Sequence, residues 1–414
     1  MDRVRLFLSF VLVSAAVSSA AQAAPYDFVV IASSALSPFS SIASFVPPSI
    51  DADGAVAFLG SAPSAGTAIF TASQRGSSLA DYLQISGRPG QIALTVDEIG
   101  SFVGGFVAFL ASDRGVYRGA GGPLALLYSP VDSNDPPAVN AAGELVFVDN
   151  LKLVRADVHG SSILFQKNDL VAGGTIWDIP ALSPDINDTG QVAFFADIDF
   201  PSGPCDEAFM RSIVGGAEVI ALGWDPLCDF TSSGLVPLAI NESGSVAYAP
   251  RIFDAAGDVQ VVFVDSTKVW DERTPGFGAS PSIGAVALND AGHVTLQVES
   301  ASGFGIYTGA DPVADKVLAS GDPLCGATVT DIDFQRYGQN NAGQLALLVS
   351  LSDGRRLVAR AEPSSGPGGQ CITVPEPATP LAVGVAALAL AWLRCRADRK
   401  KERGLTHGRT QLIG

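Results

Sequence analysis

The sequence is poor in the residues on which most catalytic and metal sites depend. It contains 3 histidines, 2 methionines and 4 tryptophans in 414 residues. Two histidines, His159 and His293, precede the C-terminal region and lie far apart in the sequence, which argues against a histidine general base or a histidine metal cluster. The chain also lacks G-x-S-x-G, Walker and H-E-x-x-H motifs, and no G-x-G-x-x-G follows a strand-like segment. We therefore expect none of the hydrolase, nucleotide-binding or metalloprotease sites that these motifs mark.

Positive charge is scarce as well. The 25 lysines and arginines face 42 aspartates and glutamates, for a net charge of −17, and much of the basic charge lies at the two ends. Such a charge disfavours binding to nucleic acid or to anionic membranes, and it favours cations. We therefore expect no nucleic-acid partner. Carboxylate-based catalysis stays open, because so many acidic residues always offer a pair at a useful separation.

Long hydrophobic runs occur only at the two ends of the chain. Residues 1–24 combine Arg3 and Arg5 with an apolar run and the ending AAQAA, which is typical of a secretory signal peptide. Residues 378–394 form an apolar segment close to the lower length limit of a membrane span. The basic tail at residues 395–414 predicts that this end stays cytoplasmic while the body lies outside. Residues 25–361 form the predicted folded domain, and residues 362–377 a linker rich in Pro, Gly and Ser.

The body is an array of repeats. The stretch INDTGQVAFFA, which begins at Ile186, has six relatives, and their glycines recur 38 to 54 residues apart: Gly54, Gly105, Gly143, Gly190, Gly244, Gly292 and Gly343. Such a period is typical of propeller blades. Asn187 through Gly190 suit a type I turn with a left-handed glycine, and the apolar run that follows suits a buried strand. We interpret this glycine strand as the innermost of its unit, with the small Ala193 facing a crowded axis.

Each unit can supply four strands. A second strand such as Gly305–Gly309 follows the glycine strand in a hairpin, a third resembles Lys316–Ala319, and a weaker fourth resembles Val329–Phe334. The ends of the body are complementary, because Tyr26–Ser33 resembles a third strand while the last unit stops after a second. This predicts an all-β fold, a seven-bladed β-propeller of four-stranded blades closed by pairing of N- and C-terminal strands, with six or eight blades as alternatives. We expect a monomer.

Four cysteines lie in the body. An even number in an exported protein permits two disulfides, and sequence proximity favours Cys205 with Cys228 and Cys325 with Cys371. Three pairings are open, as are free buried thiols. The fifth cysteine, Cys395, lies in the basic tail.

Two sets of carboxylates could bind a cation. Asp197, Asp199, Asp206 and Glu207 could gather Ca²⁺, although they lack the spacing of a calcium loop. A second set ends the third strands, near Trp224 and Trp270, which could stack on sugar rings: Asp169, Asp225, Asp271 and Asp322. The alternative for this second set is ordinary turn capping. We assign no catalytic residue, and no cofactor beyond possible Ca²⁺.

The C-terminal ending is similar to a known type of sorting signal. Pro375, Glu376 and Pro377, one apolar helix and a basic terminus together resemble the PEP-CTERM signals of Gram-negative bacteria. The resemblance implies an exosortase-like partner that cleaves near these residues and hands the body to the cell surface or matrix. The alternative is an ordinary membrane anchor.

The repeats resemble the exported bacterial proteins with tandem N-x-x-G-x-x-A-F units and a choice of C-terminal anchors. The match is strong at Gly54, Gly190 and Gly244, and weaker where Phe102, Leu296 and Leu347 depart from the pattern. This resemblance implies architecture and surface location rather than chemistry. We therefore expect a cell-surface or matrix protein that binds a polysaccharide or protein without catalysis, with a carboxylate-dependent glycan hydrolase or lyase and a purely structural matrix component as alternatives.

Overall fold

The repeated turns have the geometry that the sequence predicts. In the computed structural model, all seven repeat glycines have φ between 74° and 82°, a region that side chains other than glycine rarely adopt. Except at Gly105, the glycine N–H donates to the carbonyl three residues earlier, as from Gly190 to Asn187 (2.9 Å) and from Gly244 to Asn241 (2.9 Å). The structure describes residues 26–35, 38–88, 94–132, 136–180, 184–201, 207–222, 237–254, 257–365 and 368–372.

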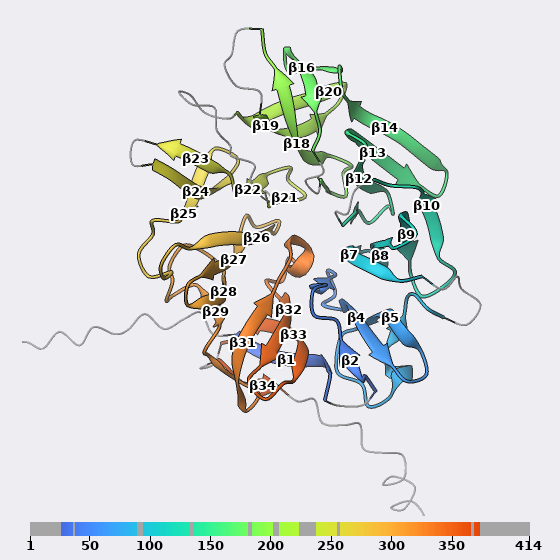
Figure 1. Ribbon diagram of the computed structural model, residues 1–414, viewed down its shortest axis with the longest axis vertical. Helices are drawn as coiled ribbons and strands as arrows, with labels where there is room; N and C mark the ends of the chain where they lie inside the picture. Colours follow the sequence, from blue (N-terminus) through green and yellow to red (C-terminus); the bar gives the residue numbers. More distant parts are fainter. Residues whose placement is uncertain are drawn as a thin grey trace, which may run out of the picture.

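The strands between these turns form seven sheets arranged as a closed ring (Figure 1). Blade 1 contains β2 (Ser41–Ile42), β3 (Ser49–Ile50), β4 (Val56–Ala62), β5 (Gly66–Ala72), η1 (Leu79–Asp81) and β6 (Leu83–Gln84). Blade 2 contains β7 (Val96–Val103), β8 (Phe106–Ala111), β9 (Gly115–Gly119) and β10 (Ala125–Tyr128). Blade 3 contains β11 (Ala138–Val139), β12 (Leu145–Asp149), β13 (Lys152–Asp157) and β14 (Gly160–Gln166). The prediction of a seven-bladed all-β propeller is confirmed.

Blades 4 to 7 complete the ring. Blade 4 contains β15 (Leu170–Val171), β16 (Gly174–Asp178), β17 (Asp185–Ile186), β18 (Val192–Asp199), β19 (Glu207–Ile213) and β20 (Gly216–Leu222), and blade 5 contains β21 (Leu238–Ile240), β22 (Val246–Tyr248), β23 (Arg251–Asp254), β24 (Gly257–Val264) and β25 (Thr267–Asp271). Blade 6 contains β26 (Ser282–Leu288), β27 (Val294–Ser300), β28 (Gly303–Tyr307) and β29 (Lys316–Ala319). Blade 7 contains β30 (Pro323–Leu324), β31 (Ala327–Asp333), η2 (Arg336–Gly338), β32 (Leu345–Leu351), β33 (Arg356–Pro363), β34 (Cys371–Ile372) and β1 (Tyr26–Ser33).

The glycine strand is the second strand of its blade, so the prediction that it is the innermost is wrong. In blade 3 the order is β11-β12-β13-β14, and the glycine strand β12 pairs with β11, which precedes the turn. The alanines expected at the axis instead pack between blades, where Ala193, for example, is fully buried beside Phe209 and Leu238. The strand that precedes the turn lines the axis instead, and its last aliphatic residue comes immediately before the turn asparagine.

Blade 2 replaces the asparagine turn by a tighter one. Val103 pairs with Phe106, which leaves Gly104 and Gly105 as a two-residue loop with φ of 58° and 79°. Positive φ at both central residues indicates a type I′ hairpin turn. This explains why Phe102 departs from the repeat pattern: it lies within β7, paired with Val107, rather than in a turn.

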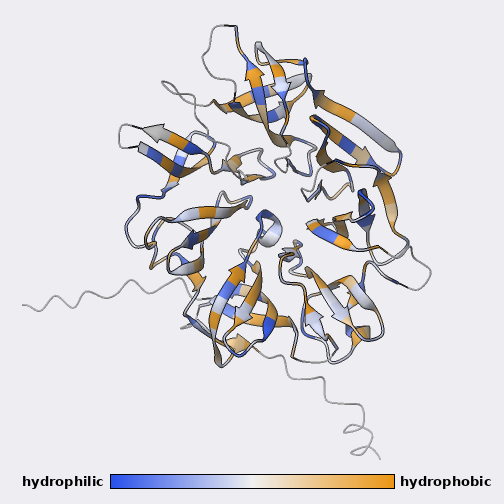
Figure 2. Cartoon of the chain, viewed as in Figure 1, coloured by the Kyte–Doolittle hydropathy of each residue, from blue (hydrophilic) through white to orange (hydrophobic). Residues whose placement is uncertain are grey.

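The hydrophobic core is divided among the seven boundaries between blades. Seven clusters of buried side chains each combine residues of two adjacent blades, and the apolar residues, orange in Figure 2, run along the strands of every blade. Between blades 1 and 7, for example, Phe58 and Phe70 pack near Leu348 and Val358. Each sheet therefore buries both faces against its neighbours, which accounts for the unbroken apolar runs of the glycine strands.

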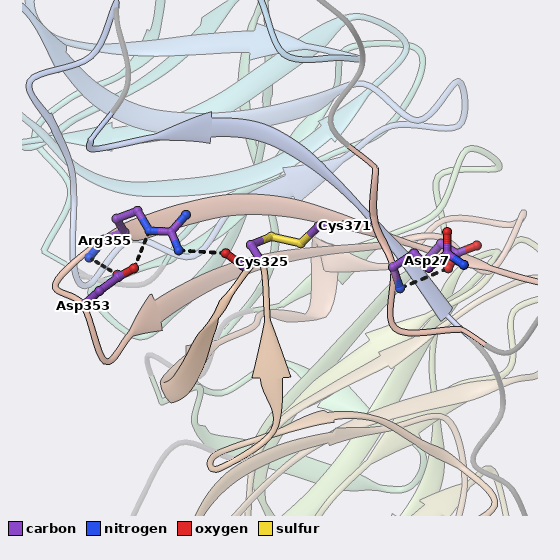
Figure 3. Close-up of a disulfide and its surroundings, with 6 residues drawn as sticks. Asp27, Cys325, Asp353, Arg355 and Cys371 are labelled. Carbon is purple, nitrogen blue, oxygen red and sulfur yellow. Dashed lines mark hydrogen bonds and ion pairs between the residues drawn. A yellow bond between two sulfur atoms is a disulfide. The ribbon is translucent and has the colours of Figure 1, made fainter.

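The two ends of the described chain close blade 7. The N-terminal strand β1 pairs antiparallel with β33, so this six-stranded sheet takes β30 to β34 from the C-terminal part and β1 from the N-terminus. Beyond β33, β34 pairs in parallel with the other edge of β1, within the stretch interpreted as a linker. A disulfide joins Cys371 of β34 to Cys325, the pairing that sequence proximity favours (Figure 3). Arg355 donates to the Cys325 carbonyl (2.8 Å) and to Asp353 Oδ2 (2.7 Å), which fixes this corner of the blade.

Several predicted features lie outside the described residues. These are the signal peptide, the membrane segment and basic tail, Cys205, Cys228, Asp206, Trp224, Asp225 and the motif Pro375, Glu376 and Pro377. Within the part of the chain that the structure does describe, no helix has the length and apolar character needed to cross a membrane.

Candidate functional site

Four of the five repeated asparagines link neighbouring blades in a partial circle of hydrogen bonds around the axis. The side-chain Nδ2 of each of these four donates to the turn carbonyl of the next blade: Asn140 to Asn187 (3.3 Å), Asn187 to Asn241 (3.0 Å), Asn241 to Asn289 (3.1 Å) and Asn340 to Asp51 (3.0 Å). The side-chain oxygen caps its own turn, as where Asn187 accepts the Gln191 N–H (2.9 Å). Asp51 accepts in the same way but has no amide to donate onward. The asparagine is therefore both a turn cap and a link between blades.

A second circle lies one residue further along the turns and consists mainly of carboxylates. Asp188 accepts the Ala141 N–H (2.6 Å), Glu242 accepts the Asp188 N–H (2.9 Å), and Asp290 accepts the Glu242 N–H (2.9 Å). Asn341 Oδ1 in turn accepts the Asp290 N–H (2.9 Å). Inward carboxylates from different blades therefore converge at the axis, but each holds a main-chain donor of its neighbour.

A short 3₁₀ turn from blade 7 crosses the axis and closes it. This turn, η2, appears as the orange coil at the centre of the ring in Figure 1. Arg336 donates to the Leu238 and Pro136 carbonyls (3.4 Å each), and Gln335 donates to the Pro47 carbonyl (2.7 Å). These three acceptors lie in or beside blades 5, 3 and 1. We call η2 together with Gln335 the axial plug.

Above the plug lies a cavity of about 260 Å³, which we call the axial pocket. Residues of all seven blades line it, and they include the carboxylates Asp185, Asp188, Glu242 and Asp290. Burial raises the pKa of Asp185, although the charge of Arg336 opposes the change. Burial, aided by the negative charges of Asp188 and Asp290, also raises the pKa of Glu242. The pocket is therefore acidic, and protonation lowers its charge at a higher pH than for free carboxyl groups.

Four arginines form a third set of links between blades. Each donates from its guanidinium to the repeat glycine carbonyl of the next blade: Arg118 to Gly143, Arg155 to Gly190, Arg211 to Gly244 and Arg360 to Gly54. Three of these arginines lie directly across from a buried alanine of the glycine strand: Arg118 from Ala108, Arg211 from Ala193 and Arg360 from Ala346. The small side chain leaves room for the arginine to reach across the boundary. The glycine leaves room as well, since a Cβ on Gly143 would overlap with Arg118 Nη1.

The predicted calcium loop is only partly described. Asp197 and Glu207 face each other across β18 and β19, and Asp178 of β16 lies beside Asp197 in the register. Asp199 pairs instead with Thr175. Among the residues that the structure describes, which leave out Asp206, no three His, Cys, Asp or Glu side chains are arranged to hold a metal ion.

The aspartates that end the third strands act as turn caps where they are described. Asp169 Oδ2 accepts the Gln166 N–H (2.9 Å), Asp322 Oδ2 accepts the Ala319 N–H (2.8 Å), and Asp271 Oδ1 accepts the Arg273 N–H (2.9 Å). Trp270 is 2% exposed, so its ring cannot stack on a sugar at the surface. Of the two tryptophans that the structure describes, the exposed one is Trp177, which is 60% exposed and has Lys167 Nζ 3.9 Å from the centre of its ring. His159 is exposed in a turn, and His293 is exposed just before β27.

Comparison with solved structures returns propellers of diverse function. No protein-family model and no curated protein matches the chain. PorZ, a surface component of the type-IX secretion system of Porphyromonas gingivalis, is 10% identical with a TM-score of 0.41 over 74% of this chain, and the chain spans 45% of PorZ. YCF48 from Cyanidioschyzon merolae is 14% identical with a TM-score of 0.41, covering 78% of this chain and 98% of YCF48. A putative gluconolactonase is 14% identical with a TM-score of 0.33, covering 63% and 87%. Similarities with such low identity and TM-score do not allow a function to be assigned from these structures.

Sequence reasoning missed the axial plug and the arginine links. The plug has a visible signal: in four repeats an aliphatic residue immediately precedes the turn asparagine, whereas blade 7 inserts Gln335 through Gln339 there. The arginine links also have a signal, because an arginine recurs in the strand that follows the glycine strand in four units. That signal becomes readable only once the pairing register is known.

Proposed function

We propose that the protein is an exported surface or matrix protein whose propeller binds a ligand, a polysaccharide or another protein, without catalysis. One observation carries the noncatalytic part: the convergent carboxylates of the axial pocket hold main-chain donors of neighbouring blades. Asp188, Glu242 and Asp290 each accept an N–H at 2.6 to 2.9 Å. A group that secures the ring in this way is poorly placed to act as a nucleophile or general base.

The pocket itself supports a binding role. It is closed below by the axial plug and built from every blade, so its walls are rigid before a ligand arrives. Preorganised walls lower the entropic cost of binding. The acidic lining favours polyhydroxylated or positively charged groups over anions. Export and surface attachment rest on the predicted signal peptide at residues 1–24 and the PEP-CTERM-like ending with its exosortase-like partner.

A glycan array probed with the full chain, with and without calcium, tests this proposal. We expect binding to a subset of glycans and no release of cleaved product. Ala52 is exposed and lines the pocket mouth, so Ala52→Trp should abolish this binding. Ala342 is an exposed turn residue that does not line the pocket, so Ala342→Trp is the matched control and should bind normally. Binding that survives Ala52→Trp would move the ligand elsewhere on the ring.

A second candidate function is a carboxylate-dependent glycan hydrolase or lyase. The observation in its favour is the convergence of carboxylates with Glu242, whose raised pKa suits a general acid. Product analysis on the glycans that bind separates the two candidates. Turnover that Glu242→Gln abolishes, while glycan binding persists, would establish the enzyme and overturn the noncatalytic proposal.

A further inference from the structure

The disulfide of blade 7 joins a firmly held turn to a weakly held strand. Its first half, Cys325, begins the two-residue turn between β30 and β31, with φ of 50°, and Gly326 follows at 82°. Turns with positive φ at both positions favour Asn-Gly, so a cysteine is unusual there. Arg355, which also binds Asp353, donates to the Cys325 carbonyl (2.8 Å; Figure 3). The turn is therefore a fixed part of the blade, and we attribute the cysteine in it to the bond that it forms.

The second half of the disulfide lies in β34, which few contacts hold. This strand adds two residues to the edge of β1, whereas β33 pairs with β1 over seven. The Phe28 N–H donates to the Gln370 carbonyl (2.8 Å), and the Gly369 N–H donates to the Tyr26 carbonyl (2.6 Å). A few hydrogen bonds offset little of the entropy lost when a segment is ordered. Docking of β34 therefore depends on the disulfide, whereas closure of the ring by β1 and β33 does not.

The disulfide lies at the edge of the core rather than inside it. Cys325 and Cys371 are both half-buried and pack against the cluster between blades 6 and 7. Their neighbours Gly326 and Ile372 are exposed. Disulfides in such positions exchange with external thiols more readily than disulfides enclosed in a core.

The position of β34 limits how far the C-terminal part of the chain can extend from the ring. The Pro-Glu-Pro motif begins at residue 375, which is 4 residues after Cys371 and 12 after Pro363, the last residue of β33. An extended chain spans at most about 3.5 Å per residue, so the motif stays within about 14 Å of a docked β34 but within about 42 Å of β33 once β34 is released. Docking therefore shortens the reach of the C-terminal part about threefold.

We propose that the disulfide between Cys325 and Cys371 is a redox latch that sets this reach. A dithiol reductant opens it: one thiolate attacks a sulfur of the bond to form a mixed disulfide, and the second thiol displaces that sulfur. Both cysteines leave as thiols and the reductant leaves as its own disulfide. β34 then separates from β1 while β33 keeps the ring closed. The purpose of the latch rests on the proposed C-terminal attachment, but its opening requires neither export nor glycan binding, so a failure of one proposal is distinguishable from a failure of the other.

Hydrogen exchange of the full chain, followed by mass spectrometry with and without dithiothreitol, tests the latch. Alkylation of freed thiols identifies the reduced cysteines in the same samples. We expect Cys325 and Cys371 to be alkylated, the Phe28 and Gly369 amides to exchange at least about 10-fold faster, and the amides of β18 to change by less than about twofold. Protection of Phe28 and Gly369 that persists after reduction would overturn the proposal. A bond that opens only when the whole ring unfolds would overturn it as well.

Cys325→Ser opens the latch without a reductant. Its Phe28 and Gly369 amides should exchange from the start as they do in the reduced wild type, and dithiothreitol should have no further effect on them. Cys395→Ser is the matched control, because it removes a cysteine but leaves both cysteines of the latch. It should keep the full response of the wild type to dithiothreitol. Slow exchange in Cys325→Ser, or loss of the response in Cys395→Ser, would contradict the assignment of the latch to this disulfide.

Discussion

Replacing Asn187 with alanine tests whether the repeated asparagine holds the blades together. Its side chain is 2% exposed, accepts from Gln191 N (2.9 Å) and Thr189 Oγ1 (2.7 Å), and donates to the Asn241 carbonyl of the next blade (3.0 Å). At about 1 kcal/mol for each net hydrogen bond, Asn187→Ala should lower the free energy of unfolding by about 3 kcal/mol. The Gln191 N–H would lose its side-chain acceptor, while the Asn241 carbonyl would keep the N–H of Gly244.

Urea unfolding followed by circular dichroism measures this loss. Thr189→Ala is the matched control, because it removes one of the same hydrogen bonds but leaves the cap and the link between blades in place. It should cost about 1 kcal/mol or less. If Asn187→Ala were as mild as Thr189→Ala, the asparagine would be only a local turn residue, and the interpretation of the circle as a structural element would be refuted.

Three further changes test other parts of the ring. In urea unfolding, Gly143→Ala should lower the free energy of unfolding clearly more than Gly292→Ala. Both glycines have φ near 80°, but only at Gly143 would the new Cβ overlap with the arginine of the preceding blade. Equal losses of stability would contradict the role of this arginine. Burial, together with a neighbouring aspartate, raises the pKa of Asp333 to about 6, so the stability present below its ordinary pKa is lost as pH rises through 6. Asp333→Asn should therefore raise the free energy of unfolding at pH 8 by about 1 kcal/mol after solvent screening, and the stabilities of variant and wild type should converge below about pH 4. A stability difference that does not depend on pH would show that Asp333 does not titrate in this way. Replacing Cys325 and Cys371 with serine removes a crosslink spanning 46 residues and should lower the free energy of unfolding by about 4 kcal/mol under oxidising conditions. A double variant as stable as the wild type would show that the disulfide does not constrain the unfolded chain.

The architecture was readable from the sequence because turn chemistry repeats. Asn187 and Gly190 each satisfy a local backbone requirement, so their recurrence marks the blades without any knowledge of tertiary contacts. Closure of the ring by the two ends of the chain could also be predicted, since Tyr26–Ser33 is an apolar strand with no partner nearby in the sequence. Its partner, β33, lies more than 300 residues away.

The order of strands within a blade was not readable in the same way. A strand buried on both faces has the same apolar composition in the first or second position, so Ala193 gave no sign of which neighbour it packs against. The axial circles were hidden as well, because the partner of Asn187 is 54 residues away and only the ring geometry brings the two together. The sequence showed an excess of acidic residues, but it did not indicate that Asp188, Glu242 and Asp290 converge at the axis or that main-chain donors already occupy them.

The most direct test of the noncatalytic proposal combines binding with product analysis on one sample. The full chain is incubated with the glycans that it retains on an array, with and without calcium, and the mixture is analysed by mass spectrometry. The account predicts retained glycans of unchanged mass and loss of retention in Ala52→Trp. Glycan fragments that accumulate with time in the wild type, and fail to appear with Glu242→Gln, would contradict it.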